Sequence, residues 1–392
     1  MPRALVIGGS LGGLFAAIVL RAGGWDVTIY EKTRGDLAGR GAGLGLSAEL
    51  FEVMRRFGAE VSPSTGVAVS SLLWLDRAGQ VVRDIKRPWL TGAWSRIYRP
   101  MREAVPDAIV ATRTLERVEQ DGARVTALFA DGGREEADLL IGADGTYSTL
   151  RRQFLPAIEQ VYAGYVAWRG VIEESELSPE AHALLSDGIA YCFPPGEMSL
   201  STPIPGRDDD VRRGHRRYYF IWYRPAEGEA LRDLLTDAAG RYQGYAIPPP
   251  LIRPDHIAAM KGDAAQLLPP VIAGIVAKAQ PLLQAVSDLE TPRLAFGRAV
   301  LLGDAAFIAR PHVAAGISKA ALDAVALAEA LAAESDIERA LARYERERLA
   351  FGRSLVAYSR YLGAASLAPE SERDPERVMR EYGAPHLLRD SG

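Results

Sequence analysis

Near its start the chain reads Ala4-Leu-Val-Ile-Gly-Gly-Ser-Leu-Gly-Gly13, and this stretch decides the fold. Its first four residues form a short apolar run, which is typical of a strand buried on both faces. After the glycines, Leu14, Ala17 and Ile18 follow at the spacing of one helix face. Val27–Tyr30 is a second apolar run. Strand, glycine turn, helix and strand within about thirty residues predict a βαβ unit, and hence a parallel sheet.

The glycine turn has the features of a dinucleotide-binding turn. Gly8 permits a tight turn out of the strand, and Gly13 lets the helix pack closely on the sheet. The backbone amides of Ser10, Leu11 and Gly12 lie at the start of the helix, where they can hold a pyrophosphate. Ser10 replaces the middle glycine of the usual pattern, and its hydroxyl can donate a hydrogen bond to the phosphate instead.

An acidic residue follows at the end of the second predicted strand. Glu31 comes eighteen residues after Gly13, where a carboxylate can accept hydrogen bonds from a ribose hydroxyl. Lys32 comes next and no basic residue replaces the acid, which argues against a 2′-phosphate and favours NAD or FAD. The alternative is an ordinary tight turn between a strand and a helix.

Two later segments each join a buried strand to an acidic turn. Leu139-Leu-Ile-Gly-Ala-Asp-Gly-Thr-Tyr-Ser148 contains Asp144-Gly145, and Arg298-Ala-Val-Leu-Leu-Gly-Asp-Ala-Ala306 contains Gly303-Asp304. Taken singly, each is also compatible with a plain strand-to-helix turn in which the Asp caps the helix.

Composition excludes several classes of protein. The 392 residues carry 46 Lys and Arg against 50 Asp and Glu, and this net charge of −4 offers no general attraction to nucleic acid or to anionic membranes. Cys192 is the single cysteine, which excludes an internal disulfide and a cysteine-based zinc site, and we expect no metal site. Leu14–Leu20 is too short to span a bilayer, and no signal peptide is recognisable. We therefore expect a soluble cytoplasmic protein.

Between the strand-end motifs the pattern becomes antiparallel. Val67–Leu75 and Val81–Ile85 predict one hairpin, and Val125–Phe129 with Ala137–Ile141 predicts another. Asp336–Gly363 predicts a long amphipathic helix, followed by a polar tail.

These patterns predict an α/β fold in which a Rossmann-like nucleotide-binding domain carries an inserted, mainly antiparallel β domain and a long C-terminal helix. The predicted boundaries are 1–69, 96–160 and 284–333 for the first domain, 70–95 and 161–283 for the second, and 334–392 for the C-terminal helix and tail.

The glycine turn and the two acidic motifs, in this order, resemble the flavoprotein aromatic hydroxylases. Three further segments are similar to one branch of that family, the 2,6-dihydroxypyridine 3-monooxygenase group. They are Tyr162-Ala-Gly-Tyr-Val-Ala-Trp-Arg-Gly170, Thr202-Pro-Ile-Pro-Gly-Arg207 and Arg310-Pro-His-Val-Ala-Ala-Gly316. The similarity extends from residue 1 to about residue 350.

This resemblance implies a single-component monooxygenase that binds FAD noncovalently. In such enzymes NADH or NADPH reduces the flavin, O2 adds at C4a, and the resulting hydroperoxide hydroxylates a hydroxypyridine-like or phenolic ring. A small aromatic substrate and O2 are therefore the expected partners, and the resembling enzymes often form homodimers. The alternatives are a flavin oxidoreductase of the same fold that does not hydroxylate, and a non-enzymatic flavin-binding sensor.

The resemblance also implies which residues contact the flavin. The glycine turn with Glu31 and Lys32 would bind the ADP half, Asp144-Gly145 would support FAD and the nicotinamide cofactor, and Gly303-Asp304 would reach the ribityl chain. The remaining implied flavin contacts are Arg40, Gly43, Leu44, Arg99, Ala315, Gly316 and Ile317.

Three consecutive residues are candidate catalytic residues. Arg310, Pro311 and His312 follow the Gly303-Asp304 motif, at the strand ends where active sites of open α/β sheets gather. His312 could accept a hydrogen bond from a ring hydroxyl or, when protonated, stabilise its anion. The alternative is that His312 only anchors its loop through hydrogen bonds.

The aromatic residues of the predicted second domain are expected in its core. Tyr191, Trp222 and Tyr223 lie on predicted strands, and large aromatic side chains dominate protein cores. We therefore expect core packing rather than pocket lining for these three. Cys192 is expected to be a small buried hydrophobic residue.

Overall fold

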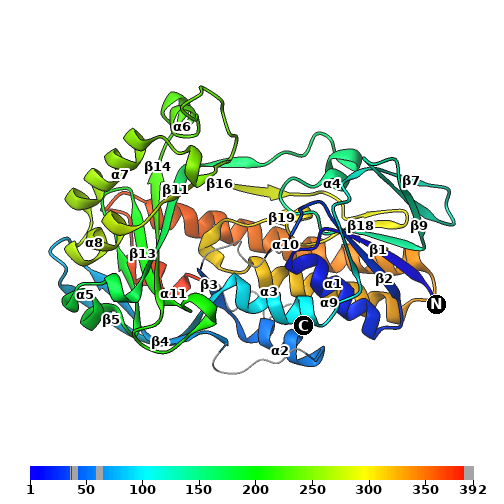
Figure 1. Cartoon of the computed structure of the whole chain (residues 1–392), viewed down its shortest axis with the longest axis horizontal. Helices are drawn as coiled ribbons and strands as arrows, with labels where there is room; N and C mark the ends of the chain where they lie inside the picture. The colour runs from blue at the N-terminus through cyan, green and yellow to red at the C-terminus, as the bar shows by residue number, and fades with distance from the viewer. Residues whose placement is uncertain (36, 38–42, 59–64, 384–392) are drawn as a thin grey trace.

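The computed structural model describes residues 1–35, 37, 43–58 and 65–383 of the chain. Figure 1 shows two lobes that lie side by side along the long axis of the molecule. One lobe is built on a mainly parallel sheet and the other on a large, mainly antiparallel sheet. The predicted fold class is confirmed.

Within the described residues, the first sheet has six strands in the order β17-β18-β10-β1-β2-β6. Their bounds are β1 (Arg3–Ile7), β2 (Asp26–Glu31), β6 (Ile109–Ala111), β10 (Leu139–Gly142), β17 (Ala295–Phe296) and β18 (Ala299–Leu301). The strands from β18 to β6 run parallel, and β17 pairs antiparallel at the edge. The predicted βαβ unit is confirmed, since β2 pairs in parallel with β1 after helix α1 (Leu11–Ala22).

Buried apolar side chains on both faces explain the continuous apolar runs of these strands. Helix α1 packs against α9 (Gly316–Ala333) on one side of the parallel sheet, and α9 is rich in buried alanines. A three-stranded sheet covers part of the molecule next to β1 and β10. It consists of β7 (Leu115–Gln120), β8 (Val125–Phe129) and β9 (Arg134–Ala137). The parallel sheet therefore holds its three strand-end motifs on a closely packed apolar base.

The second sheet follows the order β15-β16-β11-β14-β13-β12-β4-β5-β3 in the described residues, with β19 paired to β16. The bounds are β3 (Gly43–Leu46), β4 (Val67–Leu75), β5 (Val81–Ala93), β11 (Val161–Glu173), β12 (Gly188–Cys192), β13 (Met198–Ile204), β14 (Arg217–Pro225), β15 (Ala246–Ile247), β16 (Leu282–Glu290) and β19 (Phe307–Ile308). Leu75 lies opposite Val81, so the predicted hairpin of β4 and β5 is confirmed.

The predicted domain boundaries do not follow the ends of these elements. The boundary after residue 69 falls inside β4, and the one after 283 falls inside β16. Strand β3, placed by the prediction in the first domain, pairs with β5 of the large sheet. β3 is short and reads Gly-Leu-Gly-Leu, so it carries too little side-chain pattern to reveal its partner.

The remaining helices lie around the two sheets. They are α2 (Ala48–Arg56), α3 (Trp94–Glu103), α4 (Thr149–Phe154), α5 (Pro179–Leu185), α6 (Gly228–Leu234), α7 (Pro254–Leu267), α8 (Pro270–Lys278), α10 (Ile337–Leu367) and α11 (Pro375–Glu381). Within the described ranges, none of the helices is both long and apolar enough to cross a membrane.

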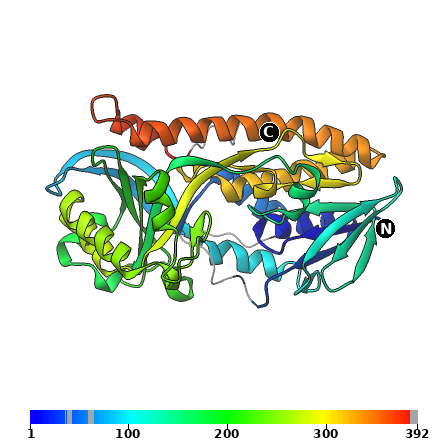
Figure 2. The same ribbon diagram turned by 90° about the horizontal axis from the view of Figure 1, so that it is seen from above.

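Helix α10 is the long helix that the sequence predicts, and it joins the two lobes. Figure 2 shows it running along one side of the molecule from the parallel sheet to the antiparallel one. Ile337, Leu341 and Tyr344 form an apolar stripe at i, i+4 and i+7 on this helix. Leu341 and Tyr344 are fully buried inside the molecule, and the Tyr344 hydroxyl donates to the carbonyl of Leu301 at 3.0 Å. This packing explains the stripe without a second copy of the chain.

The prediction of a polar tail after Gly363 is wrong for residues 364–383, and residues 384–392 lie outside the described residues. Helix α10 continues to Leu367, and the shorter helix α11 then packs on the antiparallel sheet with Val378 and Met379 fully buried. Only two large apolar side chains anchor this helix, which is too few to produce a periodic signal among the charged residues around them.

Candidate active site

The glycine turn after β1 needs glycine at two positions. Gly8 has φ +109°, and a Cβ there would overlap the carbonyl oxygen of Ala143 at the end of β10. A Cβ at Gly13 would overlap the carbonyl oxygen of Gly8. The turn therefore brings the ends of β1 and β10 into direct backbone contact, as its glycines predicted.

The start of α1 leaves its first amides available. Ser10 is the N-cap residue, and among the described residues its side chain makes no capping hydrogen bond. The first turn of α1 also holds no acidic residue. Uncapped amides at a helix start carry a partial positive charge that suits a phosphate group.

The Glu31 carboxylate lies directly beside this turn. Its Oε2 accepts a hydrogen bond from the Gly9 amide at 2.8 Å, and its Oε1 accepts one from the Thr33 amide at 2.7 Å. Each oxygen keeps a second lone pair, so a hydroxyl group at this edge can still donate to the carboxylate. Lys32 is exposed.

The Asp144-Gly145 turn is the second strand-end motif. Asp144 Oδ2 accepts hydrogen bonds from the amides of Thr149 and Leu150, at 2.7 and 3.3 Å. Its Oδ1 is buried and has no partner among the described residues. Gly145 has φ +73°, a conformation that glycine adopts without strain. The motif therefore offers a fixed acceptor next to the glycine turn.

The Gly303-Asp304 turn is the third motif and lies next to the other two. Gly303 has φ +62° and donates its amide to Asp323 at 3.0 Å. Asp304 keeps about half of its side chain exposed, at 49%, and its carboxylate is 3.3 Å from the Lys319 ammonium group. Cβ atoms added at Gly12 and at Gly303 would both contact Ala320 on α9, so these two turns lie on the same side of that helix.

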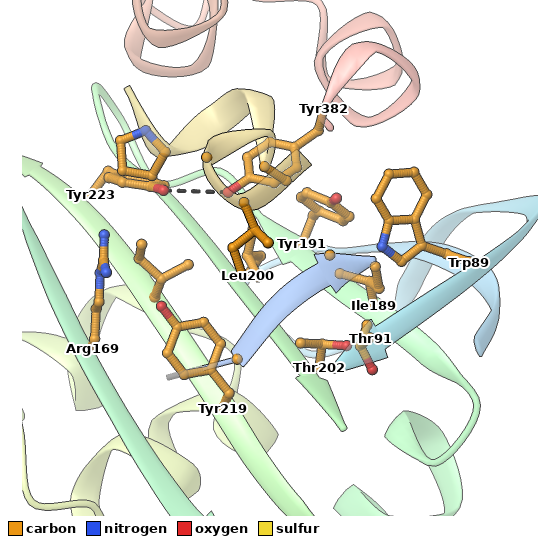
Figure 3. A pocket seen from close by; sticks show the side chains of 17 residues that line it. Trp89, Thr91, Arg169, Ile189, Tyr191, Leu200, Thr202, Tyr219, Tyr223 and Tyr382 are labelled. Atoms are coloured by element: carbon orange, nitrogen blue, oxygen red, sulfur yellow. Dashed lines mark hydrogen bonds between the residues drawn. The ribbon is translucent and has the colours of Figure 1, made fainter. Parts of the chain in front are cut away.

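Between the two lobes lies a cavity of about 250 Å³ (Figure 3). One wall is a face of the antiparallel sheet, and the other comes from the segment that joins the short helix η6 (Pro311–Val313) to α9. Its lining is mainly apolar and aromatic. The described residues around it are Gly43, Gly45, Trp89, Thr91, Arg169, Ile189, Tyr191, Leu200, Thr202, Tyr219, Ile221, Tyr223, Pro311, Ala314, Gly316, Ile317 and Tyr382.

Side chains that line the cavity alternate along the strands with side chains that pack on the opposite face of the sheet. On β14, Tyr219, Ile221 and Tyr223 line the cavity. Tyr218, Phe220 and Trp222 point to the opposite face, where they pack with residues of α7 and α8. Successive side chains of a strand point to opposite faces, so the two sets alternate along the same strand.

This division corrects the expectation for the aromatic residues. Trp222 packs in the core as expected. Tyr191 and Tyr223 are also buried in a core cluster, on the other face of the sheet, but they line the cavity as well. Both faces of the sheet are buried, so composition could not tell the core face from the cavity face. Cys192 is buried, as expected, and burial raises the pKa of its thiol to about 12.

Tyr382 lines the cavity from the C-terminal segment, and no sequence pattern pointed to it. It follows α11, and its hydroxyl lies 3.3 Å from that of Tyr223 (Figure 3). The next residue, Gly383, donates its amide to the carbonyl of His312 at 2.9 Å. Arg87 holds the same segment by donating to the carbonyl of Arg380 at 2.8 Å.

The candidate catalytic residues take different positions around the cavity. Pro311 lines it, as does Ala314, which adopts a left-handed conformation with φ +47°. Such a conformation is strained for alanine and is found mainly where the surrounding structure enforces it. His312 is fully buried and is not among the described lining residues. Arg310 pairs with the buried Asp288 at 2.8 Å.

His312 lies behind the cavity wall among aromatic rings. Its Nε2 is 2.9 Å from the Tyr165 hydroxyl, and its ring centre is 4.3 Å from that of Tyr223. Burial, helped by the charges of Arg310 and Arg169, lowers the pKa of His312 to about 3. The imidazole is therefore neutral at physiological pH, with a geometry that favours the loop-anchoring alternative.

The other expected flavin contacts fall in several places. Gly43, Gly316 and Ile317 line the cavity, and Ala315 is the N-cap residue of α9. Leu44 pairs with Gly92 within the antiparallel sheet. Arg99 forms an ion pair with Asp209 at 2.8 Å. Arg40 lies outside the described residues.

Known proteins resemble this chain over its whole length. Residues 2–187 and 285–359 match the family model described as FAD binding domain, and residues 162–288 match one described as FAD binding domain-like. The 2,6-dihydroxypyridine 3-monooxygenase of Paenarthrobacter nicotinovorans is 33% identical, over 98% of this chain and 96% of that protein. This chain belongs to the FAD-dependent aromatic monooxygenases.

Other members of the family support the same assignment. The solved structure of 2,6-dihydroxypyridine-3-hydroxylase from Arthrobacter nicotinovorans has a TM-score of 0.91 and 31% identity, covering 98% of both chains. The 6-hydroxynicotinate 3-monooxygenase of Pseudomonas fluorescens is 28% identical, over 88% of this chain and 87% of that protein. The resemblance inferred from the sequence motifs is confirmed.

The residues present fit the FAD that this monooxygenase family uses. Backbone at Gly8 and Gly13 is packed too closely for a side chain, and the first amides of α1 have no side-chain cap, so they are available to a pyrophosphate. Glu31 keeps free lone pairs at the same edge, and Asp144 has a buried oxygen without a partner among the described residues. These groups suit the phosphates and hydroxyls of a dinucleotide.

Proposed function

We propose that this monooxygenase hydroxylates a small aromatic ring that carries a ring hydroxyl, with a hydroxypyridine as the most fitting class. Two of its relatives are named for 2,6-dihydroxypyridine and 6-hydroxynicotinate, both hydroxylated nitrogen heterocycles. The observation that carries the proposal is the aromatic-lined cavity between the antiparallel sheet and the Pro311–Ile317 segment.

The size and lining of the cavity support a single-ring substrate. Its volume is about 250 Å³, and a dry apolar cavity of about 150 Å³ already admits benzene. Tyr191, Tyr219 and Tyr223 offer ring faces for stacking and hydroxyls for polar substituents. Tyr382 adds an aromatic ring to the lining, and in this proposal it helps to exclude water, which protects reactive species from side reactions.

In this proposal the three strand-end motifs hold FAD. The amides at the start of α1 bind the pyrophosphate, Glu31 binds the ribose, and Asp304 lies near the ribityl chain. When bound, FAD supplies the redox chemistry that takes electrons from NADH or NADPH and activates O2. The protein contributes placement of the ring, a dry cavity and fixed dipoles.

The three candidate catalytic residues then have separate roles. Pro311 contacts the substrate or the flavin as part of the cavity wall. His312 and Arg310 act as positioning residues, because they tie the Pro311–Ile317 segment to Tyr165 and to Asp288. The proposal also includes a cytoplasmic location and assembly of two copies of the chain into a homodimer. Light scattering tests the homodimer, and a monomer mass would refute it.

The proposal is tested by turnover of the purified, FAD-loaded protein. Oxidation of NADH and of NADPH is followed with 2,6-dihydroxypyridine, 6-hydroxynicotinate and phenol, while hydroxylated product is quantified by mass spectrometry. We expect one of the hydroxypyridines to stimulate the oxidation and to give about one product per reduced nicotinamide. Ring-stimulated oxidation without hydroxylated product would instead indicate a flavin oxidoreductase. Tight FAD binding without any oxidation would indicate a flavin-binding sensor.

A further inference from the structure

Arg169 brings a positive charge into the cavity. It lies on β11 opposite Ile221 of β14, and both side chains line the cavity. Figure 3 shows Arg169 alongside Tyr219 and extending toward Tyr223. The surrounding lining is apolar or hydroxyl-bearing, so the guanidinium is the strongest charge in this part of the site.

The charge of Arg169 has no counter-charge in the described part of the cavity. None of the described lining residues is an Asp or a Glu, and the Nε of Arg169 is buried without an acceptor. The buried arginines among the described residues all have acceptors. Arg216 pairs with Glu174 at 2.7 Å and Arg348 with Asp323 at 2.8 Å, whereas Arg151 and Arg373 donate to backbone carbonyls. Arg169 is half-buried, and a charge that is partly removed from water without a counter-charge is unfavourable, so a protein that retains one commonly uses it to bind a ligand.

We propose that Arg169 binds an anionic oxygen on the aromatic ring of the substrate, so that the ring is held as its oxyanion. That the ligand is a ring rests on the proposed function. The O–H bond of the ring hydroxyl breaks, its electron pair stays on the oxygen, and the proton goes to water. A positive charge at close range lowers the pKa of such a group by about 1–3 units.

The titratable groups around the cavity do not offer a base for the same proton. Burial raises the pKa values of Tyr191, Tyr219, Tyr223 and Tyr382, so these tyrosines remain protonated at neutral pH. His312 lies behind the wall. Among the described residues, the charge of Arg169 is therefore the feature that can favour the ionised ring, and an ionised ring is more electron-rich at carbon.

The test is a binding experiment with 4-nitrophenol, whose ionised form is seen directly by its absorption. FAD-loaded wild type, Arg169→Met, Arg169→Lys and the control Arg117→Met are titrated over a range of pH. Arg117 is exposed on the three-stranded sheet and pairs with Glu119, so its loss should change neither binding nor pKa. Benzoate is titrated in parallel, because a carboxylate would also bind a guanidinium.

In wild type we expect 4-nitrophenol to bind as its anion, with its pKa lowered by about 1–3 units. Arg169→Met should weaken binding by about 10- to 100-fold and return the pKa of the bound phenol to its solution value, while Arg169→Lys restores part of both effects. Because Met fills the space of the arginine stem without a charge, the melting temperature of the ligand-free variant should not fall.

Equal affinity and equal pKa in wild type and Arg169→Met would overturn the proposal, as would the absence of 4-nitrophenol binding to wild type at every pH. Weakening confined to benzoate would also overturn it, since it would show a carboxylate site instead. The readout needs no turnover. A wild type that binds the oxyanion through Arg169 but forms no product would therefore refute the proposed function and leave the role of Arg169 standing.

Discussion

Replacing His312 by Gln should make the free energy of unfolding of this protein less sensitive to acid, because His312 is a buried group that titrates. His312 is fully buried, and burial with the nearby charges of Arg310 and Arg169 lowers its pKa from 6.5 to about 3. Below pH 6.5 the unfolded chain therefore binds a proton at this residue that the folded protein does not. The stabilising contribution is fully present above about pH 7 and is lost as the pH falls toward 3.

The magnitude follows from the two pKa values. Each unit of pH below 6.5 lowers the free energy of unfolding by about 1.4 kcal/mol. The stability lost through His312 is therefore about 2 kcal/mol at pH 5 and under about 1 kcal/mol at pH 6. Gln keeps a polar group that can reach the Tyr165 hydroxyl but carries no titratable proton in this range. The His312→Gln variant should therefore lose about 2 kcal/mol less than wild type between pH 7.5 and pH 5.

Urea denaturation of the FAD-saturated proteins at pH 7.5, 6 and 5 measures this difference. His215→Gln is the matched control, because His215 lies exposed in the loop between β13 and β14. Parallel pH profiles for wild type and His312→Gln would refute the reasoning, because they would show that His312 titrates alike in the folded and unfolded states.

Three further predictions concern the flavin and the cavity. Glu31→Ala should raise the dissociation constant of FAD by about 10- to 150-fold in a fluorescence titration, because it removes a charged hydrogen bond worth about 1.5–3 kcal/mol. The control Glu116→Ala, at an exposed position on β7, should leave the dissociation constant unchanged. Equal affinities of wild type and Glu31→Ala would contradict the assignment of Glu31 to the ribose. Acid precipitation should release the flavin into the supernatant, and flavin retained in the pellet would disprove a noncovalent cofactor. Tyr382→Ala should leave FAD content unchanged but divert reducing equivalents to hydrogen peroxide, whereas Tyr382→Phe should stay coupled; tight coupling in both variants would show that Tyr382 does not seal the cavity.

The parallel lobe could be predicted from sequence because its signals are local. A buried strand, a glycine turn and a helix lie within one short stretch around Gly8, and Asp144-Gly145 and Gly303-Asp304 each follow a strand directly. Parallel strands place their carboxyl ends at one sheet edge, so three such motifs gather wherever the strands pair. The steric need for glycine at Gly8 and Gly13 makes that signal strong.

The cavity could not be predicted in the same way, because it depends on contacts between distant segments. Tyr223 and Trp222 are neighbours on one strand with opposite surroundings, and both faces of that strand are buried. Tyr382 reaches the site from a charged segment far along the chain. Arg169 belongs to a segment that resembles the family, but only the position of its side chain shows that it faces a cavity whose described lining contains no Asp or Glu.

The incorporation of oxygen from ¹⁸O2 tests the central claim most directly. The FAD-loaded protein is supplied with NADH or NADPH and the hydroxypyridine that best stimulates oxidation, under ¹⁸O2 in ordinary water. We expect one ¹⁸O atom in the new ring hydroxyl of each product molecule. Product that carries oxygen only from water, or reducing equivalents recovered entirely as hydrogen peroxide with the ring unchanged, would contradict the assignment of this chain as an aromatic hydroxylase.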